Sequence, residues 1–204
     1  RIVLSVLFIV GAFSVNLCAI PLTLNGTGEG LNPGDSDPNW TVTLPDSTLF
    51  GNAISAVDGG WFSPTGSGTW ISTVTSGSVP LGTYQYTTTF EIGAGLDAST
   101  AVIGGDWYSD DQNSANGIWL NGVQVSTFQG SRWDGFGDPS FTISSGFIAG
   151  TNSLTFRVTN TGGPGGTLVE NLSGSADRVP DSGTSVTLLG LALTGLAALR
   201  RRFS

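Results

Sequence analysis

The densest group of chemically capable side chains lies in residues 106–113, which mix carboxylates, amides and aromatic rings. The stretch is Asp106, Trp107, Tyr108, Ser109, Asp110, Asp111, Gln112 and Asn113. Carboxylate and amide oxygens in a loop can ligate Ca²⁺, whereas an aromatic ring beside hydrogen-bonding groups suits the face of a sugar. A third interpretation is a solvated loop in which Asp and Asn shape the turns. We select Trp107, Tyr108, Asp110, Asp111 and Asn113 as candidate ligand-binding residues.

A second stretch, residues 132–138, has the same mixture of aromatic and acidic side chains in a glycine-rich loop. It reads Arg132, Trp133, Asp134, Gly135, Phe136, Gly137 and Asp138. Trp133 is the binding candidate here, and the alternative is that Trp133 and Phe136 cover the end of the core. If both loops lie at one end of the fold, they form one site.

Trp119 is a third candidate because of its position in an expected strand. It stands between Ile118 and Leu120, and successive side chains of a strand point to opposite faces. Trp119 therefore faces away from these two core residues. An outward Trp can serve as a stacking platform for a ligand, and the alternative is that it packs under a loop.

Composition excludes most catalytic chemistry. The chain has no Lys and no His, and its single Cys is Cys18. Schiff-base enzymes, His-dependent triads and thiolate zinc sites are therefore excluded. A glycosidase with two carboxylates remains as the enzymatic alternative, but Asp110 and Asp111 are adjacent and no other pair stands out. We expect no enzymatic activity.

The net charge of the chain limits the classes of partner that it can bind. Residues 20–178 hold fourteen acidic and three basic residues, a net charge of −11. Nucleic acid is excluded, since phosphate contacts need Lys and Arg. The same balance favours a neutral sugar over a polyanion as ligand.

Alternating apolar and polar residues predict an all-β fold. The clearest strands are 84–92 and 153–159, and residues 118–125 form a hairpin around Asn121-Gly122. Further strands are expected at 40–44, 53–57, 69–74, 100–107, 141–143 and 167–172. This spacing predicts an antiparallel β-sandwich over residues 20–172, followed by a flexible linker at 173–178.

Both ends of the chain are typical of sorting signals. Residues 1–19 resemble a signal peptide with an apolar helix, cleaved after Ala19, which leaves no Cys and no disulfide. Near the other end, residues 186–199 are 14 uncharged, mostly apolar residues before Arg200, Arg201 and Arg202. As a helix they rise about 21 Å, short of the roughly 30 Å hydrocarbon core. We expect them to lodge in the membrane transiently, with the arginines on the cytoplasmic side.

The segment 179–204 has three parts in order: the motif Val179, Pro180, Asp181, Ser182 and Gly183, then the apolar stretch, then the arginines. It resembles the PEP-CTERM class of bacterial sorting signals, in the variant that reads Val-Pro-Asp-Ser-Gly. The resemblance implies recognition by an exosortase, a membrane processing enzyme of Gram-negative bacteria that make exopolysaccharide. It also implies a final location at the cell surface or in the extracellular matrix.

The middle of the chain carries a second resemblance. The hairpin at Ile118–Val123 precedes a turn and strand entry with Gly150, Asn152 and Leu154. This order resembles the galactose-binding-like jelly roll. In that family a structural Ca²⁺ often joins the N-terminal region to the last strand, which makes Glu29 and Glu170 weak metal candidates.

These observations leave three functions open. The first is an exported, non-catalytic surface or matrix protein that binds a neutral glycan. The second is a structural coat protein without a ligand, and the third is the carboxylate-dependent glycosidase.

Overall fold

The computed structural model describes residues 18–57 and 60–179, together with 190 and 195. Ala19–Arg178 forms one compact unit. The expected signal helix and C-terminal apolar helix lie outside the described residues, as do Pro180–Gly183 and the three terminal arginines. Within the described part of the chain, no helix is long and apolar enough to cross a membrane.

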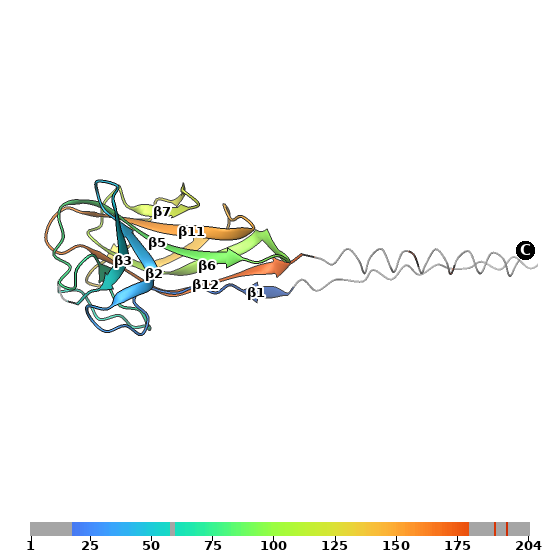
Figure 1. Cartoon of the computed structure of the whole chain (residues 1–204), viewed down its shortest axis with the longest axis horizontal. Coiled ribbons are helices and arrows are strands. Elements are labelled where there is room, and N and C mark those ends of the chain that lie inside the picture. The colour runs from blue at the N-terminus through green and yellow to red at the C-terminus, as the bar shows by residue number, and fades with distance from the viewer. Residues whose placement is uncertain (1–17, 58–59, 180–189, 191–194, 196–204) are drawn as a thin grey trace, which may run out of the picture. The chain divides into compact units, whose positions relative to one another are not determined.

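The compact unit consists of β-strands, which Figure 1 shows coloured along the chain. The strands are β1 (Ala19–Pro21), β2 (Ser36–Thr43), β3 (Leu49–Ser55), β4 (Ile71–Ser72), β5 (Gly82–Ile92), β6 (Leu96–Asp110), β7 (Gly117–Leu120), β8 (Val123–Ser126), β9 (Ser131–Arg132), β10 (Ser140–Ile143), β11 (Gly150–Asn160) and β12 (Gly166–Arg178). The all-β prediction is confirmed, and every predicted strand overlaps an observed one.

All twelve strands belong to one sheet, which bends so that its two halves face each other. The order is β10-β6-β12-β4-β3-β2-β5-β11-β7-β8, with β1 beside β12 and β9 parallel to β6. Short strands β3 and β4 join the halves. The β10-β6-β12 half packs on the β2-β5-β11-β7 half, as in a sandwich.

Phe156 of β11 lies at the centre of the contact between the halves. Its ring centroid is 5.0 Å from that of Trp107 on β6, 5.5 Å from Phe141 on β10 and 5.8 Å from Trp40 on β2. Alternate residues of β11, such as Leu154, are completely buried beside it. The alternation read from the sequence therefore identified the core face of this strand.

Two predicted turns have the expected geometry. Asn121 and Gly122 both have positive φ, at 52° and 79°, which the tight hairpin between β7 and β8 requires. At the start of β11, the Asn152 amide donates to the carbonyls of Ile148 and Gly150 at 2.7 and 2.9 Å. Its carbonyl oxygen accepts the Ile148 N–H at 2.9 Å. The Asn side chain thus holds the turn that leads into the strand.

Residues 173–178, expected to be a flexible linker, instead continue β12. They pair with β1 on one side and with β6 on the other. The short polar residues of this segment carry little hydrophobic pattern, but backbone pairing on both sides holds it, and Ala176 is buried. Because Ala19 pairs with Asp177, the first and last residues of the compact unit lie at the same end of the domain. The strand β12 runs from the other end of the domain to this one (Figure 1), and its first residue is Gly166.

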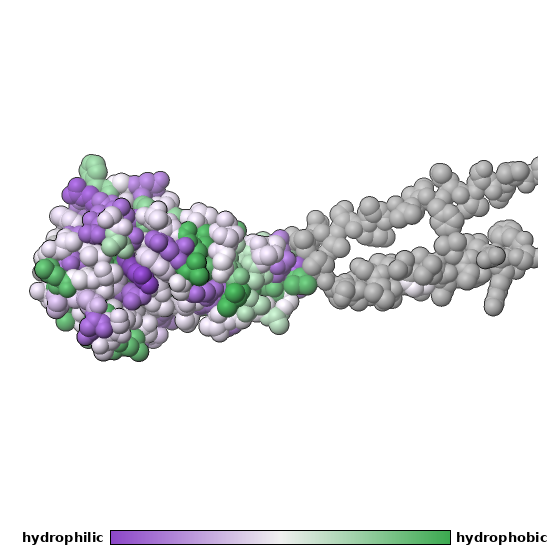
Figure 2. All heavy atoms as spheres, turned by 90° about the horizontal axis from the view of Figure 1, so that it is seen from above, coloured by the Kyte–Doolittle hydropathy of each residue, from purple (hydrophilic) through white to green (hydrophobic). Residues whose placement is uncertain are grey.

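Apolar and polar side chains are interspersed on the face of the domain that Figure 2 shows. The most exposed apolar residues include Phe136, Leu81 and Leu49. All three lie in or next to connections between strands.

Candidate ligand-binding site

The two loops selected from the sequence meet at the Gly166 end of the domain, which we call the loop end. Asp110, the last residue of β6, pairs with Gly166. The Gln112 amide donates to the carbonyl of Gly130 at 2.7 Å, and Tyr108 pairs with Ser131. The structure thus brings the 106–113 and 132–138 stretches together.

A third loop, described at residues 56–57 and 60–70, also lies at the loop end and contributes the aromatic side chains of Trp61, Phe62 and Trp70. Trp61 stacks on Trp70, with ring centroids 4.7 Å apart and planes inclined by 20°. The ring centroids of Phe62 and Tyr108 are 4.6 Å apart. The backbone N–H of Phe62 donates to the carbonyl of Trp133 at 3.0 Å. These rings form a small aromatic cluster, separate from the main core, that links all three loops.

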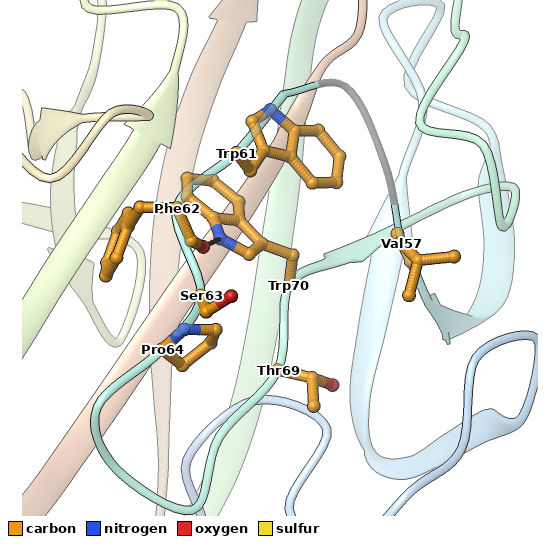
Figure 3. Close-up of a pocket in the computed structure, with 8 residues that line it drawn as sticks. Val57, Trp61, Phe62, Ser63, Pro64, Thr69 and Trp70 are labelled. Atoms are coloured by element: carbon orange, nitrogen blue, oxygen red, sulfur yellow. Dashed lines mark hydrogen bonds between the residues drawn. The ribbon is translucent and has the colours of Figure 1, made fainter.

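This third loop encloses a cavity of about 180 Å³ (Figure 3). Its lining residues are Ala56, Val57, Trp61, Phe62, Ser63, Pro64, Thr69 and Trp70. The indole of Trp70 is fixed by its N–H, which donates to the Phe62 carbonyl at 3.3 Å. Small-molecule pockets usually measure roughly 300–1,000 Å³, so the cavity suits one ring of a larger ligand. Aromatic faces and two hydroxyl groups line it together.

Asp110 lies directly behind the stacked indoles. It is only 5% exposed, and its Oδ2 accepts the Trp61 indole N–H at 2.7 Å. Burial, and to a lesser extent contact with Asp111, raises the pKa of Asp110 to about 6, although the Trp61 hydrogen bond opposes this shift. Asp110 therefore fixes the ring that borders the cavity.

Replacing Asp110 with Asn should change how stability depends on pH. Because folding raises the pKa of Asp110 from 3.8 to about 6, ionisation opposes folding. The stabilising contribution of its protonated form is complete below pH 3.8 and is lost as the pH rises through about 6. The amide of Asn carries no charge, and its oxygen can still accept the Trp61 N–H. The variant should therefore gain stability relative to wild type between pH 4 and 7, by up to about 3 kcal/mol.

Chemical denaturation at several pH values measures this difference. Asp46→Asn is the matched control, because hydrogen bonds from Thr48 lower the pKa of that exposed carboxyl. Asp46→Asn should lose stability relative to wild type over the same range. Parallel pH profiles for Asp110→Asn and wild type would contradict the role assigned to Asp110.

The other residues selected from the 106–113 stretch have mainly structural contacts. Trp107 is completely buried and its indole N–H donates to Thr167 Oγ1 at 2.8 Å, so a ligand cannot reach it in this structure. Tyr108 is buried under Phe62. Asp111 Oδ2 accepts the backbone N–H of Thr161 at 2.8 Å, and Asn113 accepts the Ala115 N–H at 2.8 Å within its own turn.

Trp133 and Trp119 occupy different parts of the surface. Trp133 is half-buried and packs on the aromatic cluster at the loop end. Trp119 points away from buried Ile118 and Leu120, as predicted, and the guanidinium carbon of Arg157 lies 4.0 Å from its ring centroid. Trp119 therefore lies on the outer sheet face and does not contribute to the cavity.

The two weak metal candidates lie on either side of one short segment. Glu170 accepts hydrogen bonds from the Thr65 hydroxyl at 3.3 Å and the Gly66 N–H at 2.9 Å. Glu29 accepts the Gly26 N–H at 3.0 Å and contacts the Ser67 hydroxyl at 3.5 Å. Both carboxylates therefore already accept hydrogen bonds from groups of the protein. Among the described residues, no group of three or more His, Cys, Asp or Glu side chains is placed to hold a metal ion, and the Ca²⁺ role stays a prediction.

Sequence reasoning missed the cavity, because neither Trp61 nor Trp70 was among the selected binding candidates. Trp70 is only 3% exposed, but one side of the stacked pair borders the cavity. The signal that could have found it is the presence of Trp61, Phe62 and Trp70 within ten residues of a segment rich in Gly, Ser and Thr.

C-terminal sorting signals of this three-part type define a class of exported proteins that are directed to the cell surface by their tails. Residues 178–203 match the family model described as the VPDSG-CTERM motif. This match confirms the PEP-CTERM-type signal predicted from Val179–Gly183 and the terminal arginines. The chain is thus an exported, surface-directed protein sorted by its tail, and its motif is of the kind that an exosortase-type processing enzyme recognises. No curated protein and no solved structure shows significant similarity to it.

Proposed function

We propose that this tail-sorted protein is a non-catalytic glycan-binding protein, and that the cavity at the loop end holds one sugar ring. The observation that carries the proposal is the stacked Trp61–Trp70 pair at the border of an open cavity. An aromatic face provides apolar area for the C–H groups of a sugar. The hydroxyl of Ser63 can exchange hydrogen bonds with a sugar hydroxyl. The hydroxyl of Thr69 already donates to the Gly28 carbonyl at 3.3 Å and lies 3.1 Å from the Ser55 hydroxyl, so it helps to fix the wall of the cavity.

Charge supports a neutral sugar at this site. Asp110 accepts the Trp61 indole N–H, Asp111 follows it in the chain, and the compact unit is strongly acidic. A uronate or sulfate in the cavity would be repelled by these carboxylates.

The placement of the acids argues against the glycosidase alternative. Glycoside hydrolysis needs two carboxyl groups on opposite sides of the scissile bond. None of the described residues that line the cavity is acidic. The carboxylate of Asp110 accepts a hydrogen bond from Trp61, and that of Asp111 accepts hydrogen bonds from the backbone N–H and the hydroxyl of Thr161.

The position of the cavity suits a surface protein. The sorting motif begins at Arg178, at the opposite end of β12 from the loop end. The thirteen residues of β12 span roughly 40 Å. A ligand can therefore reach the cavity without contacting the residues at which the tail begins. We also propose that an exosortase processes the tail and that the processed protein resides in an exopolysaccharide matrix.

Replacing Trp61 with Ala should weaken binding to a neutral polysaccharide by about 1–3 kcal/mol, the contribution of one large apolar contact. This corresponds to a loss of affinity of roughly 5- to 150-fold. Affinity electrophoresis of the full chain through gels that contain neutral polysaccharides measures the retardation. Trp119→Ala is the matched control and should migrate like wild type, since Trp119 lies on the outer sheet face.

Thermal unfolding followed by circular dichroism establishes that the Trp61 variant is folded. If wild type migrates freely through every neutral polysaccharide, the coat-protein alternative is favoured. Release of reducing ends from any of them would favour the glycosidase.

A further inference from the structure

The outer face of β5, β11 and β7 carries an ordered array of neutral polar side chains around one cation. These strands lie side by side (Figure 1). The Thr83 and Thr159 hydroxyls are 2.8 Å apart across two strands, and so are those of Thr87 and Thr155. Arg157 stands between these pairs, with Gln85 opposite it on β5.

Arg157 is held against Trp119 and keeps its hydrogen-bond donors unused. Its guanidinium carbon lies 4.0 Å from the Trp119 ring centroid, which is a cation–π distance. Within the part of the chain that the structure describes, the guanidinium makes no hydrogen bond and no ion pair, and its Nε is buried without a partner. The buried Nε is out of reach of a ligand, and the two terminal guanidinium nitrogens provide the fork of N–H groups that a ligand can use.

Gly117 provides the space for this arrangement. It lies opposite Arg157 on β7, and a Cβ there would lie 3.0 Å from Trp119 Cζ3 and 2.8 Å from the Gln124 amide nitrogen. Without a side chain at this position, the indole of Trp119 can lean over the backbone and present its face to the guanidinium.

The electrostatic surroundings of Arg157 differ from those of the domain as a whole. Arg132 is paired with Asp134 at 2.8 Å, whereas the cross-strand neighbours of Arg157 are neutral. Two acids lie along these strands: Asp111, hydrogen-bonded to Thr161 four residues beyond Arg157, and Glu91, six residues from Gln85. At the usual rise per residue they are roughly 13 and 20 Å away. Both distances exceed the Debye length of about 8 Å at physiological ionic strength, so an anion at Arg157 is largely screened from these two carboxylates.

We propose that this face binds a uronate-containing polysaccharide, with a sugar carboxylate paired to Arg157. A guanidinium fork matches the planar carboxylate through two parallel N–H···O bonds. The threonine hydroxyls and the Gln85 amide complement sugar hydroxyls along the strands. The proposal goes beyond the neutral-sugar cavity and is independent of it, since the two sites share no residue.

Isothermal titration calorimetry of the full chain with polygalacturonate, and with the same polymer methyl-esterified, tests the proposal. Esterification removes the charge and preserves the chain. We expect binding to the acid form only, and weaker binding at higher salt. Arg157→Met, which keeps an apolar stem over Trp119, should weaken binding at least tenfold. Arg157→Lys keeps the charge without the fork and should weaken it at least threefold.

Arg132→Met is the matched control and should bind like wild type, because Asp134 already neutralises that cation. Trp61→Ala should also leave polygalacturonate binding unchanged, which separates this site from the loop-end cavity. Equal binding of the esterified polymer, or no binding of wild type to polygalacturonate, would overturn the proposal. Wild-type affinity in the Arg157→Lys variant would overturn the proposal too. If Arg157→Met does not fold, the affinity of the Arg157→Lys variant tests the role of Arg157 by itself.

Discussion

Trp107→Ala should lower the free energy of unfolding by about 3–5 kcal/mol, the usual cost of removing a buried Trp side chain. Trp107 is completely buried, its ring packs on Phe156 and Phe128, and its indole N–H donates to Thr167. The substitution removes contacts between the two halves of the sandwich and leaves the Thr167 hydroxyl without this donor. Because domains are usually stable by about 5–15 kcal/mol, we expect a large fall in the denaturation midpoint.

Trp119→Ala is the matched control for this experiment, since it removes the same side chain from the outer sheet face. Trp119 is only half-buried, so its loss should cost less than about 2 kcal/mol. Equal effects of the two substitutions in urea denaturation would contradict the core position of Trp107. They would also restore Trp107 as a binding candidate.

Replacing Arg200, Arg201 and Arg202 together with Ser should abolish correct sorting. The family match ends at residue 203 and includes the three arginines. Basic residues beside an apolar segment keep that end of the chain on the cytoplasmic side. Without them, the tail should no longer be held in the orientation that a processing enzyme requires. Cell fractionation with immunoblotting should show the variant away from the surface and at its unprocessed size.

The corresponding triple Lys variant is the control, because it keeps the positive charge and changes only the side-chain geometry. It should localise and be processed like wild type. If the Ser variant reaches the same fraction at the same processed size as wild type, the arginines are not part of the signal.

The clearest strands were predictable because a buried face alternates with a polar one along them. β5 and β11 show this most clearly, with Phe90 and Phe156 inward and Thr87 and Thr155 outward. The outward direction of Trp119 follows from the same period of two. The Asn121-Gly122 turn was predictable because few other residue pairs adopt two consecutive positive φ angles.

The cavity was less predictable because it depends on contacts between segments far apart in sequence. Trp61 is fixed by Asp110, which is 49 positions away, and no local period reports such a pair. For the same reason Trp107 could not be assigned to the core. It lies at the end of a long strand where Gly104 and Gly105 interrupt the apolar alternation. The segment 173–178 has a linker-like composition, and its strand conformation comes from its two neighbouring strands.

Intact-mass spectrometry of the wild-type protein, recovered from the surface of the producing cells, tests whether a processing enzyme recognises the tail that sorts this protein. We expect a chain that is shortened at or near the Val179–Gly183 motif and lacks the apolar segment and Arg200, Arg201 and Arg202. A surface form that still contains the apolar segment and these three arginines would contradict processing of the tail.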